Sequence, residues 1–459
     1  MNKEVTSRIL AELLEARNFM GIKAALAGLT SADTADAIAE FEPAEQAALF
    51  RLLPMQSATA VFEYLPVEAQ ERLIHAMGNE QAAAIIDAMS PDDRTALLEE
   101  LPTALCAKLI NQLSPTERAI AIRLLDYPEH SVGRLMTSEY LTLREDWTAR
   151  EALDHIRTHG QGSETLNVLY VVDEVGRLLD EIRIRELLLC PLETYVRDLR
   201  DNVLISLNAT DDQEIAVAIF RKYHRTVIPV VDGYGGMVGI VTVDDILDVA
   251  EEEATEDIHK LGGMEQLDEP YMDISIHRLI RKRVTWLVVL FIGQMLTTTA
   301  MSHYEDAIQK AWILSIFMPL IISSGGNSGS QSASLIIRAM AIGEVTLRDW
   351  WKVMRREVYS GLILGIILAI IGLLRITVWS RFTDTYGPHW LLLAFTVSLS
   401  LLGVVMLGTL AGSMLPFLLK RLGLDPATSS SPFVATLVDV TGLIIYFTVA
   451  GYLLRGTLL

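Results

Sequence analysis

One acidic residue lies deep inside an apolar run near the end of the sequence. Asp439 is the single charged residue of the run 427–454. A carboxylate at the centre of a membrane helix costs about 3 kcal/mol on insertion scales, and no Lys or Arg lies in the other uncharged runs to neutralise it. We therefore expect Asp439 to face water, a cation or another subunit. A protonated Asp439, hydrogen-bonded to a neighbouring helix, is the alternative.

A second apolar run, around residues 319–334, is rich in Gly and Ser and contains Asn327. Small residues let helices approach each other closely. Backbone oxygens that are not bonded within a helix are found at membrane depth where they line a water-filled path, and the amide oxygen of Asn327 could serve in the same way. Ala435 lies one helical turn before Asp439, on a face whose neighbours are mostly small. We predict a pore lined by Gly325, Gly326, Asn327, Gly329 and Ala435. The alternative is a packing seam with no pore.

A stripe of acidic residues follows the centre of the chain. Four of its members recur at i, i+3, i+7 and i+11 and are Asp245, Asp248, Glu252 and Glu256. Glu253 and Asp257 lie beside them. Like charges on one helix face repel by a few tenths of a kcal/mol per pair. Carboxylates suit hard cations, and magnesium keeps several of its waters in such sites. We predict a divalent-cation site, and the alternative is an ordinary solvated face.

The charge distribution divides the chain near residue 275. Up to that point there are 50 acidic and 23 basic residues, and beyond it 8 acidic and 15 basic, so a net charge of −27 precedes a net charge of +7. An acidic soluble part followed by a membrane part fits this split. The soluble charge argues against a nucleic-acid partner, because such a partner is met by basic side chains. Cys106 and Cys190 lie far apart and indicate neither a disulfide framework nor a zinc site.

Five uncharged or nearly uncharged runs approach the roughly 20 residues that cross a bilayer. We predict membrane helices in 284–302, 311–337, 358–374, 389–419 and 427–454. Basic residues precede the first run and follow the second and fourth, so all three basic clusters fall on one side. By the positive-inside bias that side is the cytoplasm. The sequence begins without the apolar core of a signal peptide, so we expect a cytoplasmic amino terminus.

The soluble part contains two internal repeats. Apolar residues recur every twelve positions from Leu29 to Leu125, mostly followed by Pro or Gly, which predicts short helices stacked into an all-α solenoid. Within 134–250, the motif Val171-Val172-Asp173 with Gly176 returns 59 residues later. The second repeat therefore predicts two strand-turn-strand-helix units of an α/β module.

The runs 319–345 and 425–447 resemble the two signature segments of the MgtE family of magnesium channels, PLIISSGGNSGSQSASLIIRAMAIGEV and DPATSSSPFVATLVDVTGLIIYF. This resemblance implies a homodimer with five helices per subunit and a pore on the dimer axis. It implies that Asp439 holds hydrated magnesium and that Asp425 is a second metal-binding carboxylate, at the cytoplasmic end. The solenoid then senses magnesium, with Asp93 as a ligand. His130 departs from the acidic residue that is usual at the following junction.

The paired units resemble CBS domains, whose clefts have the size of a nucleotide. The resemblance implies a phosphate contact at Thr242 and a ribose contact at Asp245, with Ile228 and Pro229 beside them. The first copy has Arg183 and Glu186 instead, so we expect at most one conventional adenosine site, with ATP as its ligand. A CBS pair that binds no nucleotide is the alternative. Asp245 is thus a candidate for both ribose and metal.

These patterns together predict a solenoid in 1–130, a CBS pair in 131–250, a connecting helix in 251–283 and a membrane domain in 284–459. We expect a magnesium-selective homodimeric channel of the bacterial inner membrane, closed by cytoplasmic magnesium and modulated by ATP. An exporter coupled to protons or sodium through Asp439 is the alternative, and a membrane sensor that transports nothing is the third. No nucleophile-base pair or catalytic metal cluster is evident, so we expect no enzyme.

Overall fold

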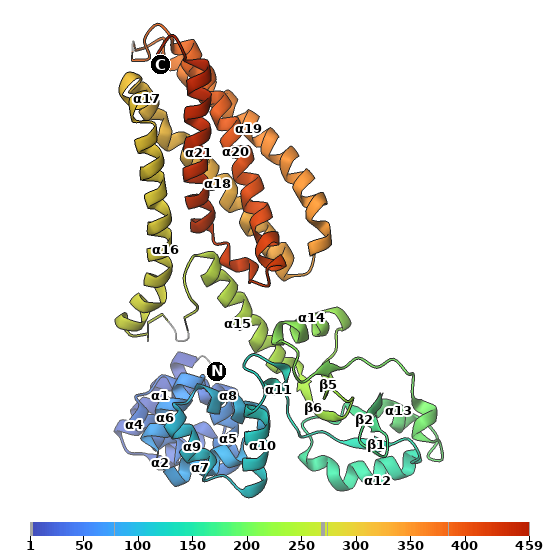
Figure 1. Cartoon of the computed structure of the whole chain (residues 1–459). Helices are drawn as coiled ribbons and strands as arrows, with labels where there is room; N and C mark the ends of the chain where they lie inside the picture. Colours follow the sequence, from blue (N-terminus) through green and yellow to red (C-terminus); the bar gives the residue numbers. More distant parts are fainter. Residues whose placement is uncertain (1–2, 78, 268–270, 273, 384, 459) are drawn as a thin grey trace. The chain divides into compact units, whose positions relative to one another are not determined.

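The computed structural model describes residues 3–77, 79–267, 271–272, 274–383 and 385–458, and Figure 1 shows the course of the chain. The chain forms two compact units, Met1–Ala250 and Glu251–Leu459. The first unit contains a helical domain and two small sheets, and the second contains long apolar helices.

Ten helices form the first part of unit one. They are α1 (Lys3–Glu15), α2 (Phe19–Leu26), α3 (Ser31–Ala39), α4 (Pro43–Phe50), α5 (Met55–Glu63), α6 (Val67–Ala76), α7 (Asn79–Ala88), α8 (Pro91–Glu100), α9 (Thr103–Ile110) and α10 (Pro115–Leu125). From α3 to α10 a helix begins every twelve residues, which confirms one helix per sequence repeat. Proline at the first helical position of α4, α8 and α10 costs no hydrogen bond, because that N–H has no partner inside the helix.

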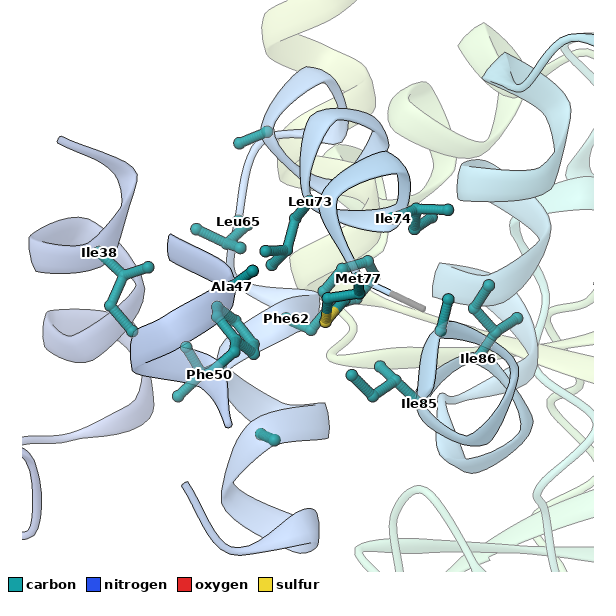
Figure 2. Packing of buried hydrophobic residues seen from close by; sticks show 14 of the residues in the cluster. Ile38, Ala47, Phe50, Phe62, Leu65, Leu73, Ile74, Met77, Ile85 and Ile86 are labelled. Atoms are coloured by element: carbon teal, nitrogen blue, oxygen red, sulfur yellow. The ribbon is translucent and has the colours of Figure 1, made fainter. Parts of the chain in front are cut away.

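Packing in this domain joins helices two positions apart in the chain. α3 packs on α5, α5 on α7, α4 on α6 and α6 on α8, which is the stacking of a helical solenoid. Phe50 and Phe62 meet edge to face at the centre, with ring centroids 6.2 Å apart. Figure 2 shows Leu73, Met77 and Ile86 around them. All five side chains are at most 5% exposed, so the repeats share one continuous core.

A longer repeat of twenty-four residues links pairs of these helices. Gln70, Arg94 and Arg118 occupy equivalent positions, and each side chain donates to carbonyl groups eight and five residues earlier. Gln70 donates to Phe62 and Leu65, for example, at 2.8 and 3.0 Å. Arg94 and Arg118 repeat the pattern from their own helices. These bonds satisfy carbonyl groups at the ends of preceding helices, which would otherwise be left without a partner.

The second part of unit one contains two three-stranded sheets of the same design. Its elements are α11 (Val132–Leu135), β1 (Thr142–Arg144), α12 (Ala149–His159), β2 (Val168–Val172), β3 (Leu178–Arg183), α13 (Ile184–Leu189), β4 (Leu207–Asn208), α14 (Gln213–Tyr223), β5 (Val227–Val231) and β6 (Met237–Thr242), with 3-10 turns at Gly160–Gly162 and Val196–Leu199. The sheet orders are β1-β2-β3 and β4-β5-β6, each with a parallel and an antiparallel pair. β2 and β3 recur as β5 and β6 at the predicted offset of 59.

The repeated aspartate shapes the turn in both hairpins. Asp173 Oδ1 accepts from the backbone of Val175 and Arg177, and Asp232 Oδ1 accepts from Tyr234 and Gly236 in the same way. Gly176 and Gly235 follow with φ of 84° and 81°, a conformation that favours glycine. The repeated Val-Val-Asp motif with its glycine therefore forms the turn of each hairpin.

α15 (Val243–Leu261) follows β6 and carries the acidic stripe. The helix ends at Leu261, and Gly262 and Gly263 form a turn in which Gly263 has φ of 73°. The next helix begins at Ile276. The prediction of one connecting helix across 251–283 was therefore wrong beyond Leu261, because the Gly-Gly pair ends the helix there.

Unit two contains α16 (Ile276–His303), α17 (Glu305–Lys310), α18 (Ile313–Ala341), α19 (Trp350–Trp379), α20 (Trp390–Arg421) and α21 (Ser431–Leu453), with 3-10 turns at Leu347–Asp349 and Pro426–Thr428. Each of the five predicted spans coincides with one long helix. Among the described residues, four helices are long and apolar enough to cross a membrane: α16, α19 with its preceding turn, α20 and α21. α18 has 29 residues, but its run of Gly and Ser lowers its hydropathy.

Close packing between α18 and α20 depends on glycine in both helices. A Cβ at Gly329 would lie 2.8 Å from Val434 Cγ1 and 3.0 Å from the carbonyl oxygen of Gly408. A Cβ at Gly412 would meet the Gly329 carbonyl oxygen even more closely. The spacing of four residues, Gly325 to Gly329 and Gly408 to Gly412, is typical of close contacts between membrane helices.

Candidate functional site

Asp439 lies on α21 between two other helices of unit two. Its carboxylate accepts a hydrogen bond from Gln294 of α16. A Cβ at Gly326 of α18 would lie 3.4 Å from Ala435 Cβ and 4.0 Å from Asp439 Oδ1. The structure thus brings Gly326, Ala435 and Asp439 together, as the pore prediction requires. Sequence reasoning missed Gln294, although a polar residue inside an apolar run was a usable signal.

The other predicted pore residues divide into two groups. Gly325 and Gly329 are buried against α20 and α21, where they act as packing surface within one chain. Asn327 is exposed on the same helix. Gly326 is buried as well, against Ala435. Pore lining by these residues stays a prediction, and the exposed position of Asn327 is the one that suits it.

Glu357 gives another polar contact between helices. α19 begins at Trp350, seven residues before Glu357, so Glu357 lies inside the helix although the apolar run predicted from the sequence begins only at residue 358. Its Oε2 accepts from the buried Ser332 hydroxyl of α18 at 2.8 Å. This bond joins α18 to α19 and is absent from the sequence-based set of sites.

Asp425 lies in unit two with the last turn of α15. Its Oδ1 accepts from the Ala427 backbone at 2.8 Å, and its Oδ2 accepts from Lys260 Nζ at 2.7 Å. The same ammonium group lies 2.5 Å from Glu256 Oε1. Burial and then repulsion from Asp425 raise the pKa of Asp257, while Lys260 lowers it. Glu256, Asp257 and Asp425 therefore form one charged group, and Lys260 was missed by the sequence analysis.

A separate acidic cluster lies in unit one, where carboxylates of the helical domain approach those of the sheet module. It consists of Glu63, Asp92, Asp93, Glu139, Glu164, Asp244 and Asp245. Burial, followed by repulsion from Asp92, raises the pKa of Asp93 to about 7. The same two causes raise the pKa of Asp245 to about 8. Negative charges crowded in this way favour protons or cations between them.

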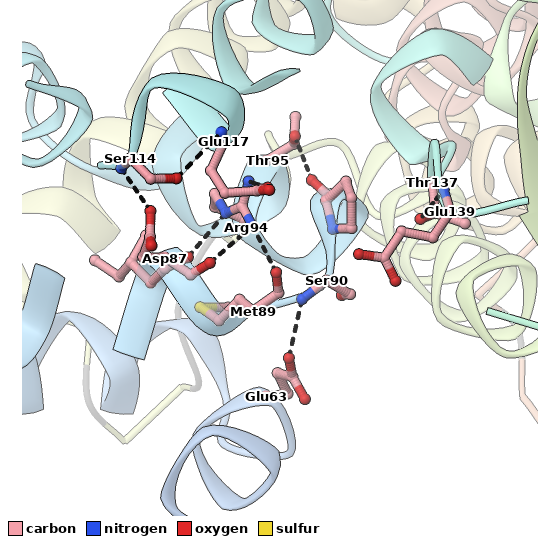
Figure 3. A network of polar contacts seen from close by, with 12 residues as sticks. Glu63, Asp87, Met89, Ser90, Arg94, Thr95, Ser114, Glu117, Thr137 and Glu139 are labelled. Atoms are coloured by element: carbon pink, nitrogen blue, oxygen red, sulfur yellow. Dashed lines mark hydrogen bonds and ion pairs between the residues drawn. The ribbon is translucent and has the colours of Figure 1, made fainter. Parts of the chain in front are cut away.

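The acidic cluster is built on a rigid turn of the helical domain. Arg94 is 1% exposed and donates to the carbonyl groups of Ile86 and Met89 at 2.8 and 2.6 Å, and to Glu117 Oε2 at 2.7 Å (Figure 3). The hydrogen bonds of Arg94 thus go to these three groups, and Asp92 and Asp93 lie in the first turn of the same helix.

Hydrogen bonds from Ser90 hold two carboxylates of this cluster in place. The Ser90 backbone donates to Glu63 Oε1 at 3.1 Å, and the Ser90 hydroxyl donates to Asp93 Oδ2 at 2.8 Å. Figure 3 also shows Glu139 beside this turn. The predicted ligand Asp93 is therefore held in place by its own helix start.

The residues predicted to contact a nucleotide come from three consecutive elements. Ile228 and Pro229 lie on β5, opposite Val241 and Ile240 of β6. β6 ends at Thr242, whose hydroxyl donates to Asp245 Oδ2 at 2.5 Å. The structure therefore brings Thr242 and Asp245 together at the start of α15.

The acidic stripe of α15 divides between two environments. Asp245 belongs to the acidic cluster of unit one, and Glu256 and Asp257 lie with Asp425 in unit two. Asp248 and Glu252 are exposed between them, and Glu253 is half-buried. In the described part of the chain, no group of three or more His, Cys, Asp or Glu side chains is arranged to hold a metal ion by itself. Magnesium that keeps its waters needs no such close cage.

A helical domain, a pair of repeated sheet modules and long apolar helices, one of which carries Asp439, indicate a membrane protein with a large part outside the membrane. Comparison with known families agrees with this class. The MgtE divalent cation transporter family matches residues 318–449, the MgtE intracellular N domain matches 29–130, and CBS domains match 132–192 and 196–252.

Relatives with assigned activity cover most of the chain. The magnesium transporter MgtE of Thermus thermophilus is 41% identical over 349 residues, 76% of either chain. That of Bacillus subtilis is 29% identical over 430 residues, 91% of this chain and 93% of the relative. The chain therefore belongs to the MgtE family of magnesium transporters, which are not enzymes.

Two solved structures resemble the intracellular part. The cytosolic domain of the Mg²⁺ channel MgtE in complex with ATP is 31% identical, with a TM-score of 0.51, and covers 53% of this chain and 99% of its own length. The soluble part of a magnesium transporter is 26% identical, with the same TM-score, and covers 55% and 100%.

Proposed function

We propose that this transporter is a magnesium-selective channel of the bacterial inner membrane, closed by magnesium on its cytoplasmic side. The observation that carries the gating part is the acidic cluster of unit one, where Asp93 and Asp245 come from different domains and repel each other. A divalent cation relieves this repulsion most when the two domains are close, so cation binding favours the compact state. That difference in affinity between states is the requirement for allosteric control.

Asp439 is the proposed ion site of the conducting path. It is the one carboxylate inside its apolar run, and its neighbours Gly326 and Ala435 are small residues. Asn327 is the proposed polar lining on α18. The five long helices of unit two are the proposed spans, α18 included, because α18 packs against both α20 and α21.

A homodimer is the proposed assembly. Only 6% of the most apolar stretch of α16 is buried against the rest of the chain, so the faces of this helix are available to lipid or to a second copy. The family resemblance favours a pore on the dimer axis, with Asp439 of each subunit facing it. The basic residues near Arg281 support a cytoplasmic location for the proposed regulatory part.

ATP is the proposed nucleotide, because a relative's cytosolic domain binds it. Thr242 and Asp245 are already hydrogen-bonded to each other at the start of α15, and Ile228 and Pro229 lie on the neighbouring strand. Asp245 also belongs to the acidic cluster, so nucleotide and magnesium share one carboxylate. We expect about one site per subunit, and Asp245→Ala should weaken binding in calorimetry with the full-length chain. Absence of heat with every adenine nucleotide would remove this part of the proposal.

Flux through purified protein in liposomes tests the channel. Magnesium is varied independently on the two sides, and single-channel or macroscopic current is recorded under voltage clamp. We expect conductance far above the turnover of a coupled exporter, and closure only when magnesium is raised on the cytoplasmic side. Flux that requires a proton or sodium gradient would favour the exporter instead.

A further inference from the structure

Lys260 places a positive charge among the carboxylates at the end of α15. Its ammonium nitrogen lies 2.5 Å from Glu256 Oε1 and 2.7 Å from Asp425 Oδ2. Glu256 is one turn earlier on the same helix, whereas Asp425 is 165 residues further along the chain. Lys260 therefore joins the helix that carries the acidic stripe to the turn that precedes α21, and α21 carries Asp439.

The ammonium group is firmly held in this position. Partial burial lowers the pKa of Lys260, but its hydrogen bonds to Asp425 and Glu256 outweigh burial and raise the pKa above its ordinary value. Asp257 adds a further negative charge next to Lys260 and Asp425. Charge-assisted hydrogen bonds of this length are stronger than neutral ones. The protein thus supplies its own cation to the carboxylates that were predicted to hold magnesium.

We infer that Lys260 is an internal competitor for the regulatory carboxylates Glu256 and Asp425, which sets the threshold for magnesium and excludes monovalent cations. This inference rests on the proposed cytoplasmic control by magnesium. A potassium or sodium ion brings the same single charge as the ammonium and loses translational freedom on binding, so it gains nothing by replacing a group already attached to the chain. A divalent cation brings twice the charge and can displace the ammonium group.

The structure also provides a place for the displaced side chain. A cavity of about 260 Å³ lies beside Lys260 and is lined by Met264, Glu265, Gln266 and Trp286. Its walls are mostly apolar, which suits the alkyl part of the lysine side chain, while Glu265 offers an alternative carboxylate for the ammonium group. Lys260 can thus leave Asp425 without becoming an unpaired buried charge.

Hydrogen exchange of the full-length chain in lipid nanodiscs tests the inference, read on peptides within residues 251–267. MgCl₂ is titrated at constant ionic strength, and KCl is titrated separately without magnesium. In Lys260→Met and Lys260→Gln, we expect the magnesium midpoint of protection to fall about tenfold, since one competing unit charge has been removed at close range. We also expect both variants to gain protection from KCl, which the wild-type chain should not show.

Three further variants separate the outcomes. Lys260→Arg keeps the charge and should keep the wild-type midpoint, and Lys352→Met removes one lysine from an exposed ion pair with Asp349 and should do the same. Asp425→Asn should raise the midpoint. If Asp425→Asn responds like wild type, or wild type does not respond at all, both the proposed site and the role of Lys260 fail. If Asp425→Asn behaves as expected but both neutral variants keep or raise the midpoint, only the inference about Lys260 is overturned.

Discussion

At the level of single residues, the proposed ion site of the membrane part consists of Asp439 and its neighbours. Asp439 has a hydrogen-bond donor in Gln294 and small neighbours in Gly326 and Ala435, and among the residues that the structure describes no basic side chain forms an ion pair with it. A neutral amide donor orients a carboxylate without cancelling its charge. The arrangement therefore keeps the attraction for a cation.

The first prediction concerns the charge of this carboxylate. Asp439→Asn keeps the shape and one oxygen but removes the charge, so magnesium uptake into liposomes should fall at least tenfold while the protein stays folded. Gln294→Leu should reduce uptake less, because it disturbs only the orientation of Asp439. Thermal unfolding in detergent checks the fold of both variants. Normal uptake by Asp439→Asn would contradict the assignment of Asp439 as the ion site.

The second prediction concerns pH and the acidic cluster of unit one. The pKa values of Asp93 and Asp245, about 7 and 8 in the folded chain, lie above their unfolded values near 4. The folded state therefore binds more protons between pH 4 and 8, and its stability should fall as pH rises through this range. Magnesium should bind more tightly at pH 8 than at pH 6, because it competes with protons for the same oxygens.

Unfolding temperatures of the full-length chain between pH 5.5 and 8 measure this effect. Without magnesium the temperature should decrease as the pH is raised, and millimolar magnesium should flatten the curve. Asp93→Asn with Asp245→Asn should flatten it as well, since neither side chain then titrates. A stability that rises with pH in the absence of magnesium would contradict the crowding of these carboxylates.

At the level of secondary-structure elements, glycine spacing decides how the long helices pack. The backbones of α18 and α20 meet where Gly329 faces Gly408 and Gly412, so no side chain separates them. The same run of small residues that permits this contact also lowers the hydropathy of α18. One composition thus explains both the close packing and the weak membrane signal of this helix.

The third prediction tests this contact. Gly412→Val should destabilise the membrane domain by roughly 1–3 kcal/mol or more, because the new side chain collides with the Gly329 backbone and the helices cannot easily separate. Gly451→Val is a matched control on α21, where a Cβ meets nothing within 4 Å. Thermal unfolding in detergent compares the two. Equal stability would mean that the two helices are not in close contact.

At the level of the whole molecule, charge is concentrated in the part that precedes the membrane helices. A net charge of −27 up to residue 275 favours separation of the acidic surfaces at low magnesium. α15 carries part of this charge, with Asp245 near its start and Glu256 and Asp257 near its end. The proposed regulation by magnesium acts on these carboxylates.

The fourth prediction concerns the response of the whole chain to magnesium. Millimolar magnesium should slow proteolysis most strongly near residues 245–283. The stripe variant, in which Asp248, Glu252, Glu253 and Glu256 are all changed to the corresponding amides, should lose this protection and should leave the channel insensitive to cytoplasmic magnesium.

Screening by salt is the competing explanation for such protection. Sodium chloride at matched ionic strength distinguishes the two, because exposed charges respond to ionic strength alone whereas a binding site requires the divalent ion. Equal protection by sodium chloride, or normal closure of the stripe variant on cytoplasmic magnesium, would mean that the stripe is an ordinary solvated helix face.

Local periodicity determined much of the architecture from the sequence alone. The twelve-residue repeat predicted where helices begin, the offset of 59 predicted two matching hairpins, and each apolar run lies in a long helix. These features are readable because each depends on neighbouring residues and on burial of one face. The sequence and its family resemblance also predict ion-binding roles for the carboxylates Asp93, Asp245, Asp425 and Asp439, and these roles stay predictions.

Only the tertiary structure decided which of these residues meet. Asp93 and Asp245 share one acidic cluster, Lys260 pairs with Asp425, and Gln294 donates to Asp439. The burial of Gly325 and Gly329 was likewise not evident from spacing. Contacts between residues this far apart depend on how whole elements pack, and a single sequence records the periodicity of each element but not the register in which two elements come together.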